Sequence, residues 1–535
     1  MSRSSSKPAR PWRCASSRPG LAHPARRQSA GPATKEAATE RNGTERRSLS
    51  VQPQERYEQQ EALSEIERLA AAGPFLPDWQ SLRAYRVPAW YAAARFGIFI
   101  HWGVYAVPAY DNEWYPRNMY LPATPAHRHH LATYGPPEHF GYKDFIPRFR
   151  AERFDPAAWA ALCKEAGARF VVPVAEHHDG FAMYRCSFSR WNAVDMGPRR
   201  DILGELAAAV RAAGLTFGLS SHRAEHWWFF NGGRTIPSDV QDPQYADLYG
   251  PARPDDEPPD GAFLDDWLAR LYELVERYRP ALIYFDWWIS RPVFRPYLAR
   301  FAAYYYNRAA HWGQEVVITY KEGAFDEASA VEDIERGRRP AISPRIWQAD
   351  TSVARNSWGY TTAQDYKPFG ALLDDLIDTV SKNGVFLLNI GPRPDGSIPE
   401  PEIDLLRRLG RWLAINGEAI YDSQPWHLHG EGPTASAAGA FSEGQQAAFT
   451  GQDLRFTRRG QILYVLLPVW PQEGRISIQA LAAASPHYPQ EVGAVHLLGG
   501  DAPLPWQRDD QGLHITLPTT PPGERGGVLK ILPAG

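Results

Sequence analysis

The segment FGIFIHWGVYAVPAYDNEWYPRNMY, from Phe96 to Tyr120, begins as an apolar run and turns abruptly polar and aromatic at His101. A run that is apolar at every position predicts a strand buried on both faces. Such strands are typical of parallel sheets, whose ligands bind at the carboxyl ends of the strands. The segment therefore predicts a parallel β/α architecture with His101 at the edge of a pocket.

Similar apolar runs recur along the chain and alternate with helical patterns. RFDPAAWAALCKEAGA, for example, has Asp155 as a candidate N-cap and Pro156 at the first helical position. The later strand-like runs are RFVVPVAEHHDGF, LTFGLSSHRAEHWW, ALIYFDWW, EVVITYKEG, RIWQADTS and GVFLLNIG. Strand–helix alternation without a Gly-rich phosphate loop favours a (β/α)8-like TIM-type barrel over an open doubly wound sheet.

The pattern of apolar residues changes after Trp426. Short alternating runs such as DLRFTRRGQILYVLLPVW and GLHITLP are separated by Gly and Pro, which predicts an antiparallel β-sandwich. We therefore expect a catalytic barrel over residues 56–424 and a C-terminal sandwich over residues 425–535. Residues 1–55 are rich in Arg and Ser and poor in large apolar groups, so a disordered tail is expected there. Whether this tail is a targeting segment or an over-long start stays open.

Composition narrows the function classes. The net charge of -3 gives no basic field for nucleic acid. No run approaches the roughly 18 apolar residues of a membrane span, and the N-terminus lacks a secretory signal, so a cytoplasmic location is expected. The three cysteines, Cys14, Cys163 and Cys186, match neither a disulfide framework nor a zinc motif. The surplus of aromatic residues (19 Trp, 25 Tyr and 23 Phe) is compatible with a sugar ligand and equally with a large core.

Asp286 follows a buried apolar strand directly, in IYFDWW. Burial raises the pKa of a carboxyl group unless hydrogen-bond donors or cations stabilise its charge. An ionised aspartate at this position therefore needs a structural or functional explanation. One interpretation is a nucleophile or a general base. The other is an ordinary cap of the next helix.

His177 and His178 end the second strand-like run. Neighbouring residues on a strand point to opposite faces, and no third ligand has a diagnostic spacing, so no metal is expected. Imidazole both donates and accepts hydrogen bonds, which suits binding of substrate hydroxyls. Core histidines with satisfied partners are the alternative.

Cleavage of a glycosidic bond needs a second carboxyl group, because the leaving oxygen must be protonated while the anomeric carbon is attacked. Glu113 lies in an aromatic loop after the first strand and could equally be a solvated loop carboxylate. Further candidates on the same barrel face are Glu225, Glu322, Glu332 and Glu335. Local sequence does not choose among them.

Taken together, the chain resembles the α-L-fucosidases of glycoside hydrolase family 29 over roughly residues 78 to 426. The resemblance rests on the blocks RFGIFIHWGVYAVPAYDNEWY, FDPAAWAALCKEAGARFVVPVAEHHDGF, ERYRPALIYFDWW, SWGY, SKNGVFLLNIGPRPDGSIP and GRWLAINGEAIYDSQPW. It implies a retaining exo-hydrolase that removes terminal α-L-fucose by double displacement through a covalent intermediate. No metal or organic cofactor is implied.

The resemblance also implies roles for individual residues. Asp286 matches the nucleophile, and the pair Glu113 and Trp114 matches the wall of the sugar pocket. Trp358, in SWGY, matches an aromatic group near the fucose methyl. The residues that match ligands of the fucose hydroxyls are His101, His177 and His178.

The acid/base is implied to be a Glu in a variable loop after the nucleophile strand. Glu335, in DIERGR, fits best, with Glu332 and Glu322 as alternatives. Two departures from the family lie at the pocket. Ser220-Ser221-His222 stands where many members carry Tyr, so His222 could take over the contact with the nucleophile. Trp287-Trp288 follows the nucleophile where glycine is common.

These departures leave two other functions open. One is a catalytically impaired fucose-binding protein, and the other is a glycosidase for a related sugar such as a galactoside. The expected partner is a fucosylated glycan or a small fucoside, without nucleic acid or membrane. Linkage preference, natural substrate and homo-oligomerisation stay open.

Overall fold

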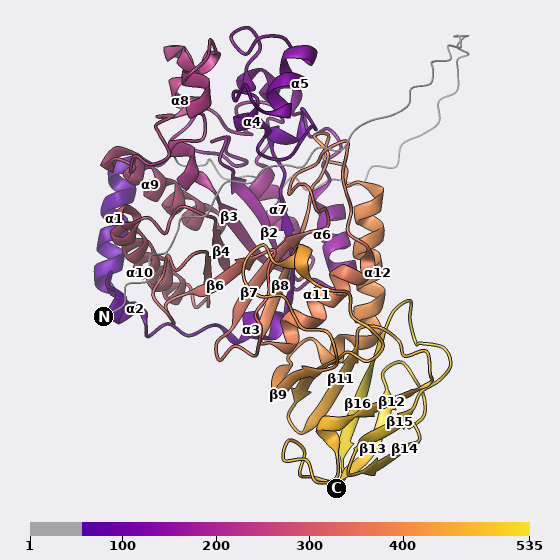
Figure 1. Ribbon diagram of the computed structural model, residues 1–535. Helices are drawn as coiled ribbons and strands as arrows, with labels where there is room; N and C mark the ends of the chain where they lie inside the picture. Colours follow the sequence, from indigo (N-terminus) through magenta and orange to yellow (C-terminus); the bar gives the residue numbers. More distant parts are fainter. Residues whose placement is uncertain (1–55, 535) are drawn as a thin grey trace, which may run out of the picture. The chain divides into compact units, whose positions relative to one another are not determined.

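The computed structural model describes residues 56–534, and the predicted disordered tail lies outside them. Eight parallel strands close into a barrel in the order of the sequence (Figure 1). This confirms the predicted fold class. The strands are β1 (Phe96–Ile100), β2 (Phe170–Glu176), β3 (Thr216–Ser221), β4 (Leu282–Phe285), β5 (Val317–Tyr320), β6 (Val331–Glu335), β7 (Trp347–Ser352) and β8 (Gly384–Ile390).

Helices connect the strands and begin at local sequence signals. The Asp155 side chain accepts hydrogen bonds from the backbone of Ala157 and Ala158, with Pro156 at the first helical position, as predicted. The longer helices cover the outside of the barrel (Figure 1). The helices are α1 (Gln59–Ala72), α2 (Trp79–Leu82), α3 (Ala89–Ala94), α4 (Tyr115–Asn118), α5 (Pro125–Thr133), α6 (Pro156–Glu165), α7 (Ile202–Ala212), α8 (Ala246–Tyr249), α9 (Gly261–Tyr278), α10 (Arg295–His311), α11 (Phe369–Ser381) and α12 (Glu400–Asn416). None of the helices between residues 56 and 534 combines the length and apolar character that crossing a bilayer would require.

Large side chains fill the barrel below its carboxyl end. Phe99 of β1 is fully buried, and its ring lies 4.8 Å from that of Tyr284 on β4. The same ring lies 4.4 Å from the imidazole of His101 and 6.2 Å from Trp358. Because interiors pack densely, this layer forms a rigid floor beneath the polar groups at the strand ends.

Strand β6 was not among the predicted strands, and Glu335 ends it rather than lying in a variable loop. The sequence VEDIE contains three acidic residues, unlike the other barrel strands, and a buried ionic cluster lies beside this strand. Asp333 accepts a hydrogen bond from Gln348 at 2.7 Å and lies 3.2 Å from Lys321. The placement fixes Glu335 to the sheet, at the end where parallel strands carry their functional groups.

The C-terminal part forms two antiparallel sheets, in the orders β13-β16-β11-β10-β9 and β12-β15-β14. Apolar residues from both sheets make one core, which confirms the predicted antiparallel β architecture. The strands, orange to yellow in Figure 1, are β9 (Gln424–Glu431), β10 (Leu454–Arg459), β11 (Ile462–Leu467), β12 (Arg475–Ile478), β13 (Val492–Leu497), β14 (Trp506–Asp509), β15 (Gly512–Thr516) and β16 (Gly527–Pro533).

Candidate active site

Asp286 lies immediately beyond β4, with its side chain only 12% exposed. Its Oδ2 is 2.8 Å from Nδ1 of His222 and 3.5 Å from Nε2 of His178. The next two elements along the chain are capped by Arg291 and Phe294, so Asp286 is not a helix cap. Its carboxylate faces His222 and His178 instead.

The charge of Asp286 is held by its neighbours. Burial alone would raise the pKa of this carboxyl group, but the adjacent His222, with Lys321 and His178, brings it well below its usual value. Asp286 is therefore ionised over the ordinary pH range, the state that a nucleophile requires.

Four histidines converge on Asp286. The ring centroid of His177 lies 4.3 Å from that of His178 and 4.9 Å from that of His222. The ring centroids of His101 and His222 are 5.2 Å apart. The expectation that His177 and His178 point apart is wrong, because both follow the last residue of β2 and have left its alternation. The sequence position therefore delivers two rings to one pocket.

Hydrogen bonds define which ring nitrogens face a ligand. His101 places Nδ1 2.8 Å from the side-chain oxygen of Asn389, and His178 donates from Nδ1 to the backbone carbonyl of His222 at 2.9 Å. Both rings therefore keep Nε2 as an acceptor. Burial depresses the pKa values of His101 and His177 and lowers that of His178 to about 4, so these rings are neutral near pH 7.

Among residues 56–534, two groups hold donor atoms that lie within 4.8 Å of one another inside each group, as metal ligands would. The groups are His101, His177 and His222, and His178, His222 and Asp286. His222 belongs to both groups. Its Nδ1 contacts Asp286, and its Nε2 lies 2.8 Å from Oγ of Ser220, so neither nitrogen is free for a metal. This arrangement suits hydrogen bonding to hydroxyl groups better than metal coordination.

Glu113 is 6% exposed, so it is not a solvated loop carboxylate. Its Oε2 accepts hydrogen bonds from the backbone N–H of Trp358 at 2.7 Å and from Oγ of Ser357 at 3.0 Å. Burial raises its pKa, and these two bonds oppose the rise. The ring of Trp114 lies 5.2 Å from His178 and that of Trp358 lies 5.1 Å from His101, so both indoles border the histidine cluster.

Glu335 is the one buried carboxyl group among the three acid/base candidates. Its Oε2 lies 2.8 Å from Nζ of Lys321 and accepts a hydrogen bond from Nε1 of Trp287. Burial raises the pKa of Glu335. The Lys321 charge lowers this pKa, whereas the charges of Asp350 and Asp286 raise it further. A carboxyl group with a raised pKa beside an ionised one suits an acid working with a nucleophile.

The two alternatives lie in different surroundings. Glu332 pairs with Arg339, and 43% of its side chain is exposed. Glu322 is exposed, and its nearest recorded bond is a weak one of 3.4 Å from Oγ of Ser290. Neither shares the buried cluster of Lys321.

The structure separates Glu225 from the other candidate carboxylates and adds Lys321, which the sequence analysis did not name. Glu225 is 5% exposed, and its Oε2 lies 3.7 Å from Nδ1 of His178. Burial raises the pKa of Glu225 well above its usual value, and the negative charges of Asp286 and Glu335 raise it further. Lys321 is 2% exposed. Its only sequence signal is its position directly after β5, in TYKEG.

Comparison with known proteins identifies the family of the chain. The family model "Alpha-L-fucosidase" matches residues 62–418, and "Alpha-L-fucosidase C-terminal domain" matches residues 446–531. The tissue α-L-fucosidase of Rattus norvegicus is 31% identical over 84% of this chain and 90% of its own length. The tissue α-L-fucosidase of Homo sapiens is 30% identical over 86% of this chain and 91% of its own length. The crystal structure of Thermotoga maritima α-fucosidase in complex with fucose is 29% identical, covers 86% of this chain and all of its own, and superposes with a TM-score of 0.68. The chain therefore belongs to the α-L-fucosidase family of glycoside hydrolases.

Proposed function

We propose that this α-L-fucosidase releases terminal α-L-fucose from a fucosylated glycan or small fucoside with retention of configuration. The observation that carries the proposal is the pairing of an ionised Asp286 with a buried Glu335 of raised pKa at one end of the barrel. The lowered pKa of Asp286 favours the ionised form that a nucleophile needs, and the raised pKa of Glu335 favours the protonated form that an acid needs.

In the first step, a carboxylate oxygen of Asp286 forms a bond to the anomeric carbon of fucose. The bond from that carbon to the leaving oxygen breaks, and Glu335 gives its proton to that oxygen. His222 keeps the Asp286 carboxylate in position through its 2.8 Å contact. The products of this step are the free leaving group and a fucosyl ester of Asp286.

In the second step, Glu335 is ionised and accepts a proton from water. The resulting hydroxide attacks the anomeric carbon, and Asp286 leaves as a carboxylate. Lys321, 2.8 Å from Oε2 of Glu335, stabilises the ionised form that this step needs. Two inversions at one carbon give net retention.

The sugar itself is bound by neutral groups. Nε2 of His101 and of His178 can each accept a hydroxyl proton, and Nδ1 of His177 is buried without a partner among the described residues. A fucose hydroxyl would satisfy that nitrogen. Glu113 and Trp114 line the wall, and the indole of Trp358 offers an apolar surface to the 6-methyl group.

Product stereochemistry tests the proposal. Hydrolysis of an aryl α-L-fucoside is followed by proton NMR, and the first-formed sugar is expected to be α-L-fucose. First-formed β-L-fucose would exclude double displacement. A panel of aryl glycosides, including an α-galactoside, tests the related-sugar alternative.

Trapping identifies the nucleophile. A 2-deoxy-2-fluoro-fucosyl fluoride is expected to leave a stable ester on the peptide that contains Asp286, detected by mass spectrometry. Label on any other peptide would overturn the assignment. Fucose binding without turnover of aryl or natural fucosides would instead favour the impaired fucose-binding protein.

A further inference from the structure

A loop of the C-terminal part reaches the acid/base candidate. Residues 432–445, here called the bridging loop, follow β9 and end with a short 3-10 helix. The backbone N–H of Phe441 donates to the carbonyl of Glu335 at 2.8 Å, and that of Glu443 donates to the carbonyl of Arg336 at 3.0 Å. The loop is therefore hydrogen-bonded to the backbone of Glu335 itself, and it falls between the two family matches, which end at residue 418 and resume at 446.

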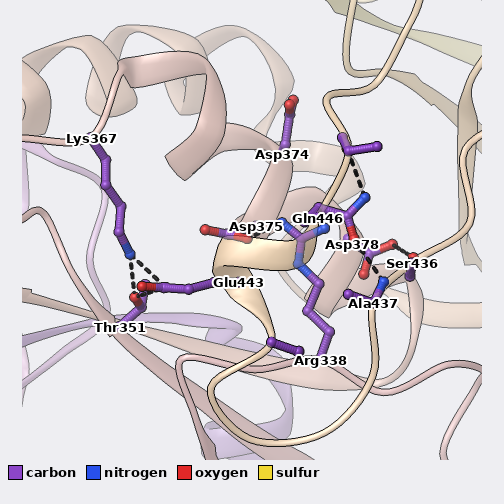
Figure 2. A network of polar contacts seen from close by, with 12 residues as sticks. Arg338, Thr351, Lys367, Asp374, Asp375, Asp378, Ser436, Ala437, Glu443 and Gln446 are labelled. Carbon is purple, nitrogen blue, oxygen red and sulfur yellow. Dashed lines mark hydrogen bonds and ion pairs between the residues drawn. The ribbon is translucent and has the colours of Figure 1, made fainter. Parts of the chain in front are cut away.

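A buried charge cluster anchors the bridging loop. Figure 2 shows the Glu443 carboxylate joined to Lys367 and Thr351, both at 2.6 Å, and Arg336 lies 2.8 Å from its other oxygen. Although burial acts to raise it, the charges of Lys367 and Arg336 bring the pKa of Glu443 down to about 2. The anchor therefore stays charged across the working pH range.

This anchoring holds an aromatic side chain at the surface. Phe441 is 40% exposed, and its backbone has a φ of 56°, which is unfavourable for a residue other than glycine. Its ring stacks on Trp287, with centroids 5.7 Å apart and planes at 14°. Trp287 is itself only partly buried, and its Nε1 donates to Glu335.

Single exposed apolar residues are common and need no explanation. Phe441 differs because an unfavourable backbone conformation presents it next to an indole that contacts the acid/base candidate. Strain retained beside a functional group points to a role there. The oxygen that Glu335 would protonate joins fucose to the leaving group, so the leaving group must lie on the same side of the pocket as Glu335.

We infer that Phe441 and Trp287 form the subsite for the leaving group, and that its ligand is the pyranose ring to which fucose is attached. The C–H face of that ring would pack on the aromatic pair while Glu335 reaches the oxygen between the two sugars. This inference rests on the proposed fucosidase function. It assigns a substrate-binding role to the C-terminal part through the bridging loop.

The test compares two substrates in the full chain. α-L-Fucosyl fluoride has a leaving group that is too small to occupy the subsite, whereas a fucosyl-galactose disaccharide fills it. For Phe441→Ala, the ratio of kcat/KM for the disaccharide to kcat/KM for the fluoride is expected to fall about 10-fold, mainly through KM. Phe441→Tyr keeps the ring and should keep the ratio near that of the wild type.

Two further variants separate the subsite from general damage. Leu76→Ala removes another exposed apolar side chain (46% exposed) and should leave the ratio unchanged. Glu443→Gln weakens the anchor and should lower the ratio as Phe441→Ala does. An unchanged ratio in a Phe441→Ala protein that melts like the wild type would overturn the inference while leaving the fucosidase intact. A wild type that hydrolyses neither substrate would refute the proposed function itself.

Discussion

His222 places Nδ1 2.8 Å from Oδ2 of Asp286 while its Nε2 lies 2.8 Å from Oγ of Ser220. For Nδ1 to donate to the carboxylate from a neutral ring, Nε2 must accept the serine hydroxyl proton. Ser220 thus selects the tautomer, and His222 orients the oxygen beside it.

Replacing His222 by Ala should lower kcat about 10- to 100-fold, the range seen when a positioning hydrogen bond is removed. KM for an aryl α-L-fucoside should change much less, because the hydroxyl ligands stay in place. Ser220→Ala is the matched control, and it should cost only a few-fold in kcat because the ring itself remains. A His222→Ala enzyme with the kcat of the wild type would show that the contact does not position Asp286.

Asp286→Ala should reduce turnover by about 10⁴-fold or more while fucose still binds by calorimetry. Azide can enter the space left by the carboxylate and attack the anomeric carbon from the same face. The expected product is the β-L-fucosyl azide, identified by NMR. Formation of the α-azide in this variant would mean that another group had acted as nucleophile.

Glu335→Ala should slow hydrolysis of natural glycosides far more than that of aryl fucosides, since a good leaving group needs little protonation. Azide should restore turnover by attacking the fucosyl ester of Asp286, which gives the α-L-fucosyl azide. Glu332→Ala and Glu322→Ala serve as controls with near-normal activity. Rescue by azide in either control, and not in Glu335→Ala, would move the acid/base assignment.

The pH dependence of kcat/KM should report the acid form of Glu335. Burial raises its pKa and Lys321 opposes the rise, so activity is lost as pH increases through that pKa. Lys321→Met removes the opposing charge and should move this basic limb to higher pH. The limb should be absent with fucosyl fluoride, whose departure needs no proton. A limb that is unchanged in Lys321→Met would mean that another group controls it.

The barrel could be predicted from the sequence because strands buried on both faces are almost entirely apolar, as in β1 and in β2 before Glu176. Strand β6 was not predicted because its ionisable residues Asp333 and Glu335 interrupt the apolar pattern, and their partner Lys321 comes from the end of β5. His101 and Asp286 were found since each directly follows an apolar run. Partners across the barrel leave no such local signal, because pairing in space is independent of distance along the chain.

Glu225 and Phe441 are also residues whose spatial contacts leave no local signal in the sequence. Glu225 was one of several indistinguishable carboxylates until burial and its contact with His178 separated it from the others. Phe441 lies 155 positions after Asp286 and in the C-terminal part, where the sequence shows only turns and short strands. Its place beside Trp287 depends on the anchor of the bridging loop, which brings together residues from four separate segments.

A second buried cluster joins the barrel to the C-terminal sheets. Asp378 of α11 lies 2.7 Å from Nζ of Lys382 and 2.8 Å from Nε of Arg455 on β10, and its side chain is fully buried. Asp378→Ala would leave two buried cations without their counter-charge, at an expected cost of about 3–5 kcal/mol of unfolding free energy. Arg407→Ala breaks the exposed pair with Glu165 and should cost no more than about 1 kcal/mol. Chemical denaturation of both variants makes the comparison.

The same cluster predicts how stability depends on pH. Burial would raise the pKa of Asp378, but Lys382 and Arg455 outweigh it and lower the pKa from its ordinary 3.8 to about 2. Because the unfolded chain binds this proton more readily, the contribution of Asp378 is complete above about pH 4 and is lost as pH falls toward 2. The difference in unfolding free energy between wild type and Asp378→Ala should therefore shrink over that interval, whereas the difference for Arg407→Ala should stay small throughout. A difference for Asp378→Ala that is constant from pH 5 to 2 would show that lost packing, and not the buried charge, accounts for the effect.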